Sequence, residues 1–398
     1  MKLVSPPRIN GTTYYLGVND RTKPLFENLW SIPEGVAYNS YLILDEKTVL
    51  LDTVEIAFAG SFFEKIDRLL EGRPLDYLII NHMEPDHAGS IALLKQRHPE
   101  TTLVVNKRTV PMLEAFHGRQ EPLLVVDETS ELGIGSRALR FLLAPMVHWP
   151  EVMFTYDPLE KVLFSADAFG SYGALNGGIF DDEVDCDRFL DETYRYYANI
   201  IAKYGRQVQN ALGKAAALEI RTICSTHGPI WRSRIPEVIA LYDKLSKYET
   251  EPGVVIAYGS MYGNTEEMAE LVARSLAHHG VRNIRMYHTG YANPSYILAD
   301  LFRYNGVILG SPTYNMEMWP PMADLVEKIK TRYIPNHILG TFGSGAWNGA
   351  VEGKFAPLAK ELGWTEAAAP VIGLGRMNEE TCDKLWELGR LMAEKVLG

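Results

Sequence analysis

The sequence has little cysteine: Cys186, Cys224 and Cys382 are the three cysteines among 398 residues, and no two of them form a CxxC pair. A disulfide framework and a cysteine-rich metal site are therefore excluded, and a reducing compartment is expected. Basic residues are also in deficit, since 39 Lys and Arg stand against 50 Asp and Glu. This balance argues against a nucleic-acid partner, whose phosphates attract clustered positive charge.

The sequence has no uninterrupted apolar stretch of the length that crosses a membrane. Its first residues, MKLVSPPRING, contain prolines where a secretory signal needs an apolar segment. We therefore expect a cytoplasmic protein with no membrane partner. At 398 residues the chain is long enough for two or three domains, each with its own core.

Short apolar segments in the first part of the chain predict buried strands. They occupy 41–45, 48–54, 77–82 and 101–106, and they continue in LRFLLAP, VMFTYD and KVLFSAD. A helical stretch rich in Tyr and Ala follows from about 187 to 217, and after it comes the strand of TICSTHG. The pattern predicts an α/β sandwich built from two sheets.

A charged segment, KYETEPG, ends at Pro252-Gly253 and marks the expected domain boundary. We assign 1–250 to the first domain and 251–398 to the second. In the second domain the strands VVIAYG, IRMYH, GVILG, ILGTFG and APVIGLG alternate with helical segments. This alternation predicts a flavodoxin-like, doubly wound parallel sheet of five strands.

Four potential metal ligands, His82, Glu84, Asp86 and His87, fall within the segment NHMEPDHAG directly after a predicted strand. Alternate residues of extended backbone point to the same side, so the first three are expected to converge, and His87 then turns in as the chain leaves the strand. Three further potential ligands follow other predicted strands: His148, Asp167 and His227.

The seven side chains offer three carboxylates and four imidazoles, a donor set suited to iron as well as to zinc. The arrangement resembles the metallo-β-lactamase superfamily, whose zinc hydrolases usually carry a histidine where this chain has Glu84. A carboxylate there adds negative charge and harder oxygen donors. A redox metal can also accept electrons from a flavin domain in the same chain, whereas zinc cannot.

The seven residues, together with the HWP segment at 148–150, resemble the di-iron ligand pattern of the flavodiiron proteins. That resemblance implies an αββα metallo-β-lactamase-like first domain. It assigns one iron to His82, Glu84 and His148. It assigns the second iron to Asp86, His87 and His227, with Asp167 as the bridge. In some members of the family the imidazole equivalent to His87 swings off the metal.

The segment SMYGNT at 260–265 lies between a predicted strand and a helix and predicts a phosphate-binding loop formed by hydroxyls and helix N–H groups. The absence of G-x-G-x-x-G argues against a dinucleotide. Two later loops, 311–315 and 343–349, follow strands where such sheets bind ligands, and Tyr314 and Trp347 are expected to pack on the isoalloxazine ring. The predicted FMN-binding residues are Ser260, Met261, Tyr262, Gly263, Asn264, Thr265, Pro312, Thr313, Tyr314, Asn315, Ser344, Gly345, Ala346, Trp347, Asn348 and Gly349.

The resemblance to flavodiiron proteins covers nearly the whole chain and implies an oxidoreductase. FMN would feed a di-iron centre that reduces dioxygen to water, nitric oxide to nitrous oxide, or both. The chain holds no rubredoxin-type CxxC pair, so we expect a separate electron donor, rubredoxin first and a reduced deazaflavin second. The family's head-to-tail pairing implies a homodimer or a dimer of dimers, with the FMN of one subunit beside the irons of its neighbour.

Two other interpretations stay open at this point. One is a zinc-dependent hydrolase with an accessory flavodoxin-like module, against which Glu84 argues. The other is an electron carrier whose two metals are only structural. Tyr197 is a candidate hydrogen-bond donor near the substrate or, equally, a core tyrosine, and Asp52 is interpreted as structural.

Overall fold

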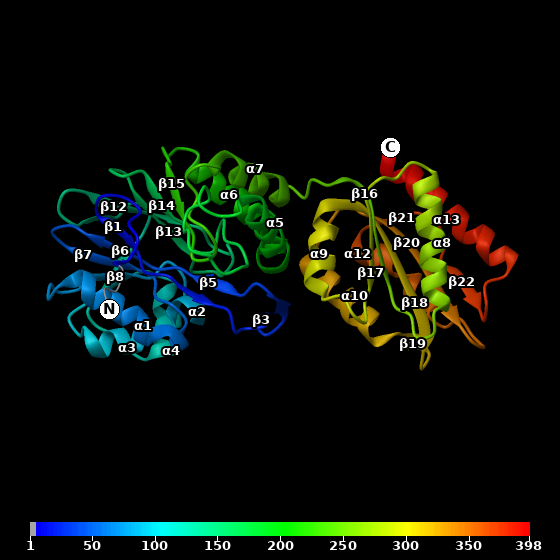
Figure 1. Cartoon of the computed structure of the whole chain (residues 1–398), viewed down its shortest axis with the longest axis horizontal. Coiled ribbons are helices and arrows are strands. Elements are labelled where there is room, and N and C mark those ends of the chain that lie inside the picture. Colours follow the sequence, from blue (N-terminus) through cyan, green and yellow to red (C-terminus); the bar gives the residue numbers. More distant parts are fainter. Residues whose placement is uncertain (1–4) are drawn as a thin grey trace. The chain divides into compact units, whose positions relative to one another are not determined.

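The structure, a computed structural model, describes residues 5–398 and divides after Ser246 into two compact units. Figure 1 colours the N-terminal unit from blue to green and the C-terminal unit from yellow-green to red. Among the described residues, none of the helices combines the length and the apolar character that a membrane crossing needs.

The first sheet of the N-terminal unit has six strands, in the order β1-β6-β7-β8-β9-β10. Their bounds are β1 (Thr13–Tyr15), β6 (Tyr41–Leu44), β7 (Thr48–Leu51), β8 (Tyr77–Ile79), β9 (Thr102–Asn106) and β10 (Leu123–Val126). Strands β7 to β10 are parallel, whereas β1 and β6 are antiparallel additions. The helices on the outer side of this sheet (Figure 1) are α1 (Ala59–Leu70), α3 (Ile91–Arg97) and α4 (Thr109–His117).

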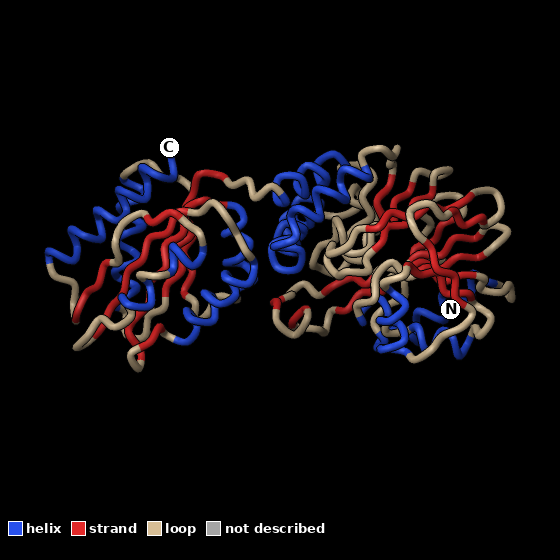
Figure 2. Tube along the Cα trace, turned by 180° about the vertical axis from the view of Figure 1, so that it is seen from behind, coloured by secondary structure: helices blue, strands red, loops and turns tan. Residues whose placement is uncertain are grey.

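The second sheet has five strands, β11 (Glu131–Gly133), β12 (Ala138–Leu143), β13 (Met153–Asp157), β14 (Val162–Phe164) and β15 (Thr222–Cys224). Seen from behind in Figure 2, helices cover this sheet as well. They are α5 (Cys186–Tyr196), α6 (Gly205–Ala215) and α7 (Ile235–Ser246). Two short ladders complete the unit: β2 (Val18–Asp20) with β5 (Val36–Tyr38), and β3 (Leu25–Phe26) with β4 (Trp30–Ser31).

The core of this unit lies between the two sheets. Alternate residues of each strand point inward, such as Tyr41 and Ile43 from the first sheet and Leu139 and Phe141 from the second. Their burial is the main stabilising term, at roughly 25 cal/mol per Å² of apolar surface. The predicted αββα sandwich is confirmed.

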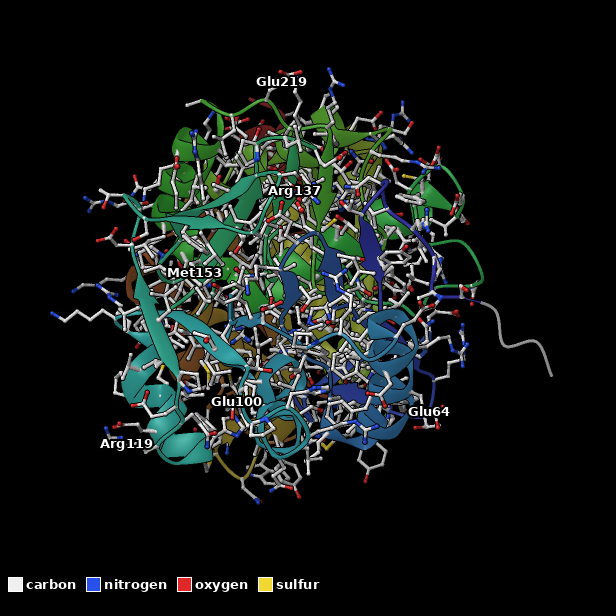
Figure 3. The ribbon with its side chains drawn as sticks, turned by 90° about the vertical axis from the view of Figure 1, so that its left-hand side faces the viewer. Glu64, Glu100, Arg119, Arg137, Met153 and Glu219 are labelled. Atoms are coloured by element: carbon white, nitrogen blue, oxygen red, sulfur yellow. The ribbon has the colours of Figure 1, made fainter. Side chains whose placement is uncertain are left out.

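Charged side chains of the N-terminal unit lie mostly on its outside, as Figure 3 shows for Glu64, Glu100, Arg119 and Glu219. Arg137 is buried instead, and its Nη1 lies 3.1 Å from Asp157 Oδ2. Met153 is fully buried in the core.

The predicted helical stretch from about 187 to 217 is interrupted. After α5 the chain forms a π-helical turn at Tyr197–Ile201 and a 3-10 turn at Ala202–Tyr204 before α6 begins. Ala202 has φ +36°, which is not compatible with a continuous helix.

The C-terminal unit has a parallel sheet in the order β17-β16-β18-β20-β21. The bounds are β16 (Glu251–Tyr258), β17 (Ile284–His288), β18 (Tyr304–Tyr314), β20 (Ile338–Gly345), β21 (Thr365–Glu366) and β22 (Val371–Leu374). Both β21 and β22 pair with β20, at different points along it, so they share the fifth position. Pro370, which lacks an N–H for the ladder, lies in the interruption between them. The predicted flavodoxin-like sheet is confirmed.

Helices cover both faces of this sheet (Figure 1). On one side lie α8 (Asn264–His278) and α13 (Glu379–Leu397), which pack against each other. On the other side lie α9 (Pro294–Arg303) and α10 (Pro320–Arg332). Helix α8 follows β16 in the chain, so its N-terminus lies near the carboxyl end of that strand.

The segment 311–315, predicted as a loop, is instead mostly strand. Strand β18 continues to Tyr314 and pairs with β19 (Glu317–Met318) in a tight hairpin. Asn315 and Met316, with φ values of +49° and +66°, form the two-residue turn, the kind of turn that asparagine favours. The residues that line the pocket are therefore held by a hairpin.

Candidate di-metal centre and cofactor pocket

The NHMEPDHAG segment leaves the strand earlier than predicted, so the extended-backbone argument is wrong for Asp86. Strand β8 ends at Ile79, and a short helix, α2 (Pro85–Ala88), begins with a proline whose fixed φ suits the first helical position. Asp86 and His87 therefore lie on a helical turn, whereas His82 and Glu84 precede it.

Neighbouring residues hold this segment in place. The buried Asp52 carboxylate accepts hydrogen bonds from the backbone N–H groups of Asn81 (2.7 Å) and His82 (3.2 Å). The Thr53 hydroxyl donates to the His87 carbonyl at 2.6 Å. Asp52 also accepts from Asn81 Nδ2 at 2.9 Å and contacts no ligand ring, which agrees with the structural role expected for it.

The first group of potential ligands consists of His82, Glu84, His148 and Asp167, all buried. Glu84 Oε2 lies 3.0 Å from His148 Nε2 and 3.3 Å from His82 Nε2. Asp167 Oδ2 lies 3.1 Å from His148 Nε2 and 3.6 Å from His82 Nε2. The polar atoms of the four side chains thus converge on one point.

The second group consists of Asp86, His87 and His227, also buried. The two oxygens of Asp86 each lie 3.5 Å from a different ring, Oδ1 from His87 Nε2 and Oδ2 from His227 Nε2. The other Asp167 oxygen, Oδ1, lies 3.2 Å from His87 Nε2 and 3.8 Å from His227 Nε2. Asp167 therefore directs one oxygen to each group, as a bridging carboxylate does.

Two hydroxyl groups fix the Asp167 carboxylate. Thr226 Oγ1 donates to Oδ1 at 2.5 Å, and the Tyr196 hydroxyl donates to Oδ2 at 2.9 Å. The tyrosine beside the site is thus Tyr196, whereas Tyr197 packs against Tyr242 with ring centroids 5.1 Å apart. Sequence reasoning missed Tyr196 and Thr226, because the face that α5 turns toward the ligands depends on how the helix packs and not on a local sequence pattern.

The loop that carries His227 is held by a buried amide. Asn39 Nδ2 donates to the carbonyls of Ser225 and Gly228, at 2.9 Å each. Gly228 has φ +70°, and a Cβ there would meet the Ser171 hydroxyl at 2.0 Å. Glycine is required at this position, directly after a potential ligand.

The buried carboxylates and imidazoles of the cluster shift one another's pKa values. Burial opposes protonation of His148 and His87, but the carboxylates beside them outweigh it and raise the pKa of each imidazole to about 9. Burial raises the pKa of Asp86 to about 7, with nearby carboxylates adding to the shift. Burial and the His87 charge lower the pKa of His227 to about 4. In contrast, the imidazoles hold the pKa of Asp167 well below its usual range despite burial.

Two metal cations fit this cluster. Among the described residues, His82 Nε2 and both oxygens of Asp86 are buried without a hydrogen-bond partner, which is costly unless another group satisfies them. Three carboxylates and four imidazoles provide mixed oxygen and nitrogen donors, the chemistry expected around non-haem iron. All seven predicted ligands are brought together.

The C-terminal unit has a cavity of about 440 Å³ at the carboxyl ends of its strands, within the size range of cofactor sites. Fourteen of the sixteen predicted FMN residues line it, and Gly263 and Gly349 do not. Met316 and Gly375 also line it and were not predicted. Met316 lies one residue beyond the predicted loop 311–315, and Gly375 follows β22 far along the chain. The lining residues are Ser260, Met261, Tyr262, Asn264, Thr265, Pro312, Thr313, Tyr314, Asn315, Met316, Ser344, Gly345, Ala346, Trp347, Asn348 and Gly375.

The cavity fits a flavin phosphate and ring. Helix α8 begins beside it after Gly263, which has φ +95°, and no side chain caps the helix, so its first N–H groups are available to an anion. A Cβ at Gly345 would meet the Asn348 carbonyl at 1.8 Å, so glycine lets the backbone approach closely. Trp347 and Tyr262, 85% and 93% exposed, leave aromatic faces available for stacking.

Comparison with known proteins agrees with both sites. Residues 36–228 match the family model described as ODP family beta lactamase, and residues 256–384 match the flavodoxin model. The chain is 30% identical over 367 residues to an anaerobic nitric oxide reductase flavorubredoxin of Escherichia coli, covering 91% of this chain and 76% of that protein.

Two solved structures resemble the whole chain. One is the rubredoxin:oxygen oxidoreductase of Desulfovibrio gigas, with a TM-score of 0.95, 29% identity and 99% of both chains covered. The other is the flavodiiron protein of Giardia intestinalis, with a TM-score of 0.94, 26% identity, and 100% of this chain and 98% of that chain covered.

Proposed function

The chain belongs to the flavodiiron proteins. We propose that it reduces dioxygen, nitric oxide or both at a di-iron centre supplied with electrons by FMN. It is an oxidoreductase whose cofactors are FMN and two irons. The observation that carries the proposal is the Asp167 carboxylate, whose two oxygens face two separate groups of ligands.

His82, Glu84 and His148 would hold one iron, and Asp86, His87 and His227 would hold the other, with Asp167 shared between the two groups. The irons and the flavin, when bound, supply the electrons that the reaction requires: four for dioxygen, two for a pair of nitric oxide molecules. The protein's own groups exclude bulk water, since all seven ligands are buried. The Tyr196 hydroxyl and Thr226 hold the bridging carboxylate in one orientation.

The FMN residues are assigned by the same reasoning. The N–H groups at the start of α8, with the hydroxyls of Ser260 and Thr265, would bind the phosphate. Tyr314 and Trp347 would pack on the ring system. Support comes from the cavity that these side chains line and from the uncapped helix that opens on it.

The two alternatives from the sequence are not favoured. A zinc hydrolase leaves the flavin pocket without a purpose, and the matched relatives bear the names of oxidoreductases. The names of the relatives, which state reactions of nitric oxide and oxygen, also disfavour an electron carrier with structural metals.

The electron donor is proposed to be a rubredoxin, with a reduced deazaflavin as the second candidate. Support comes from the Desulfovibrio gigas relative, whose name states a rubredoxin reaction, and from the Escherichia coli flavorubredoxin. Because the sequence has no CxxC pair, this chain itself supplies no rubredoxin-type iron site.

A head-to-tail homodimer, or a dimer of such dimers, is proposed to bring the FMN of one subunit to the irons of the next. The exposed rim of the FMN cavity, with Tyr262, Trp347 and Met316, is an apolar surface that a second copy would cover. Dilution to monomer should then abolish turnover while both cofactors stay bound, and full activity of the monomer would contradict the pairing.

The functional division is proposed as 1–250 for the di-iron domain and 251–398 for the FMN domain, near the structural division after Ser246. A cytoplasmic location is proposed because the three cysteines are free.

The test is gas consumption with reduced rubredoxin as donor, followed with oxygen and nitric oxide electrodes. We expect consumption of at least one gas that stops when either FMN or iron is removed. Consumption of neither gas by protein that carries both cofactors would contradict the proposed function.

A further inference from the structure

Glu151 is a buried carboxylate in contact with a metal ligand, and the function described above does not use it. Its side chain is fully buried, and its Oε1 lies 2.8 Å from His82 Nδ1 and 2.9 Å from the backbone N of Met83. Among the described residues its other oxygen, Oε2, has no hydrogen-bond partner. A buried carboxylate needs hydrogen-bond donors to offset the cost of its burial, and here His82 Nδ1 and the Met83 N–H are those donors.

The contact fixes the tautomer of His82. Because Glu151 accepts the hydrogen bond, Nδ1 carries the proton. Nε2 is then deprotonated, and its lone pair is free to bind a metal. His82 Nε2 is buried without a hydrogen-bond partner and points at Glu84 and Asp167. Glu151 therefore holds the ring in the orientation that ligation requires and makes the nitrogen more basic.

The imidazoles of the second group of ligands have weaker hydrogen-bond partners at Nδ1. His227 Nδ1 donates to the backbone carbonyl of Ala37 at 2.8 Å, a neutral acceptor. His87 Nδ1 is buried and has no hydrogen-bond partner among the described residues. Among the four imidazoles, only His82 thus has a carboxylate as its Nδ1 partner. His227 has a backbone carbonyl, and no Nδ1 partner is found among the described residues for His87 or for His148, whose contacts are made through Nε2.

We propose that Glu151 is a positioning residue that makes the two metal positions unequal. The position of His82, Glu84 and His148 then holds its metal more tightly than the position of Asp86, His87 and His227. Of the two imidazoles at the second position, His87 has no Nδ1 partner and is the less restrained on its metal. This inference rests on the proposed function only in that both use the same seven ligands.

The test is a metal titration of the apo-protein with Co²⁺, followed by the visible spectrum of the bound ion. The unmodified protein should bind in two phases of different affinity. In Glu151→Gln the tight phase should weaken by about 10- to 100-fold, the usual effect of removing a group that orients a ligand. The weak phase should stay unchanged.

Asp52→Asn is the matched control. It removes another buried carboxylate that contacts the segment of His82, but Asp52 accepts from the backbone N–H of His82 and does not contact its ring. The asparagine oxygen can still accept from the N–H groups of Asn81 and His82, so we expect the tight phase to weaken much less than in Glu151→Gln. If both variants weaken both phases alike, the effect is loss of negative charge alone and the proposal is wrong, as it also is if neither variant changes either phase.

A measurement on the unmodified protein covers the case in which Glu151→Gln does not fold. Crystals of protein loaded with one equivalent of Co²⁺ should show anomalous scattering at the His82 position. Equal occupancy of both positions, or a preference for the His87 position, would overturn the proposal. Neither experiment needs gas or FMN, so a protein that reduces no gas yet fills its positions in this order would sink only the proposed function.

Discussion

The two sites of this chain are built in opposite ways. In the N-terminal unit the ligands are side chains, all seven are buried, and hydroxyls and amides fix the loops that carry them. In the C-terminal unit the pocket is open, and it depends on backbone N–H groups and on aromatic side chains with large exposed fractions. A metal pair needs fixed donors at fixed distances, whereas a flat cofactor needs an accessible cleft through which electrons can enter.

The comparison implies that a single side chain matters more in the first site than in the second. Asp167→Asn should show the largest effect, because Asp167 is shared by both ligand groups and is fully buried. Removing an orienting partner alone costs about 10- to 100-fold, so loss of the shared ligand should lower gas reduction by more than about 100-fold. Gas electrodes and iron analysis measure this, and the FMN content should stay unchanged.

In the C-terminal unit the most sensitive position is a glycine. In Gly345→Ala the new Cβ would meet the Asn348 carbonyl at 1.8 Å, so the loop must shift. Overpacking costs about 1–3 kcal/mol, roughly a tenfold to hundredfold loss of FMN affinity if it falls on the cofactor site. Gly353→Ala, where a Cβ would meet nothing within 4 Å, is the control for fluorescence titration with FMN. Equal affinities in the two variants would contradict a close backbone approach.

The two adjacent tyrosines test whether the hydrogen bond to Asp167 matters for activity. Tyr196→Phe removes the hydroxyl that donates to Asp167, whereas Tyr197→Phe changes a ring that packs against Tyr242. Hydrogen bonds to charged groups contribute about 1.5–3 kcal/mol. We expect roughly a tenfold slower gas reduction in Tyr196→Phe and a smaller change in Tyr197→Phe. The reverse order, measured as steady-state rates, would refute the assignment.

Trp347→Ala should show the smallest effect. The side chain is 85% exposed in the single chain, so the free energy of unfolding should change by no more than about 0.5 kcal/mol. Its stacking is expected to contribute about 0.5–1.5 kcal/mol to FMN binding, which is at most about a tenfold change in affinity. Denaturant unfolding and FMN titration measure the two quantities separately.

Much of the fold could be predicted because apolar strands and their following turns are local patterns. The alternation of strands and helices after Val254 gave the parallel sheet, and ligands placed after strands such as those ending at Phe164 and Cys224 met as expected. The backbone conformation between the ligands could not be predicted as well. Asp86 was expected on extended backbone but lies on a helical turn that begins at Pro85.

Contacts that depend on tertiary packing could not be predicted. The contact of Tyr196 with Asp167 joins residues 29 positions apart, and the contact of Glu151 with His82 joins residues 69 positions apart. Likewise, Gly375 reaches the FMN cavity only because β22 pairs with β20. No local pattern encodes any of these three contacts.

The most direct test of the account is a single turnover of the protein loaded with iron and FMN, fully reduced beforehand and mixed with one equivalent of dioxygen. Two ferrous ions and one reduced FMN hold the four electrons that take dioxygen to two waters. We predict that flavin absorbance and iron Mössbauer spectra both report oxidation and that no peroxide is released. Peroxide as the main product, or a purified protein that binds zinc and not iron, would contradict the account.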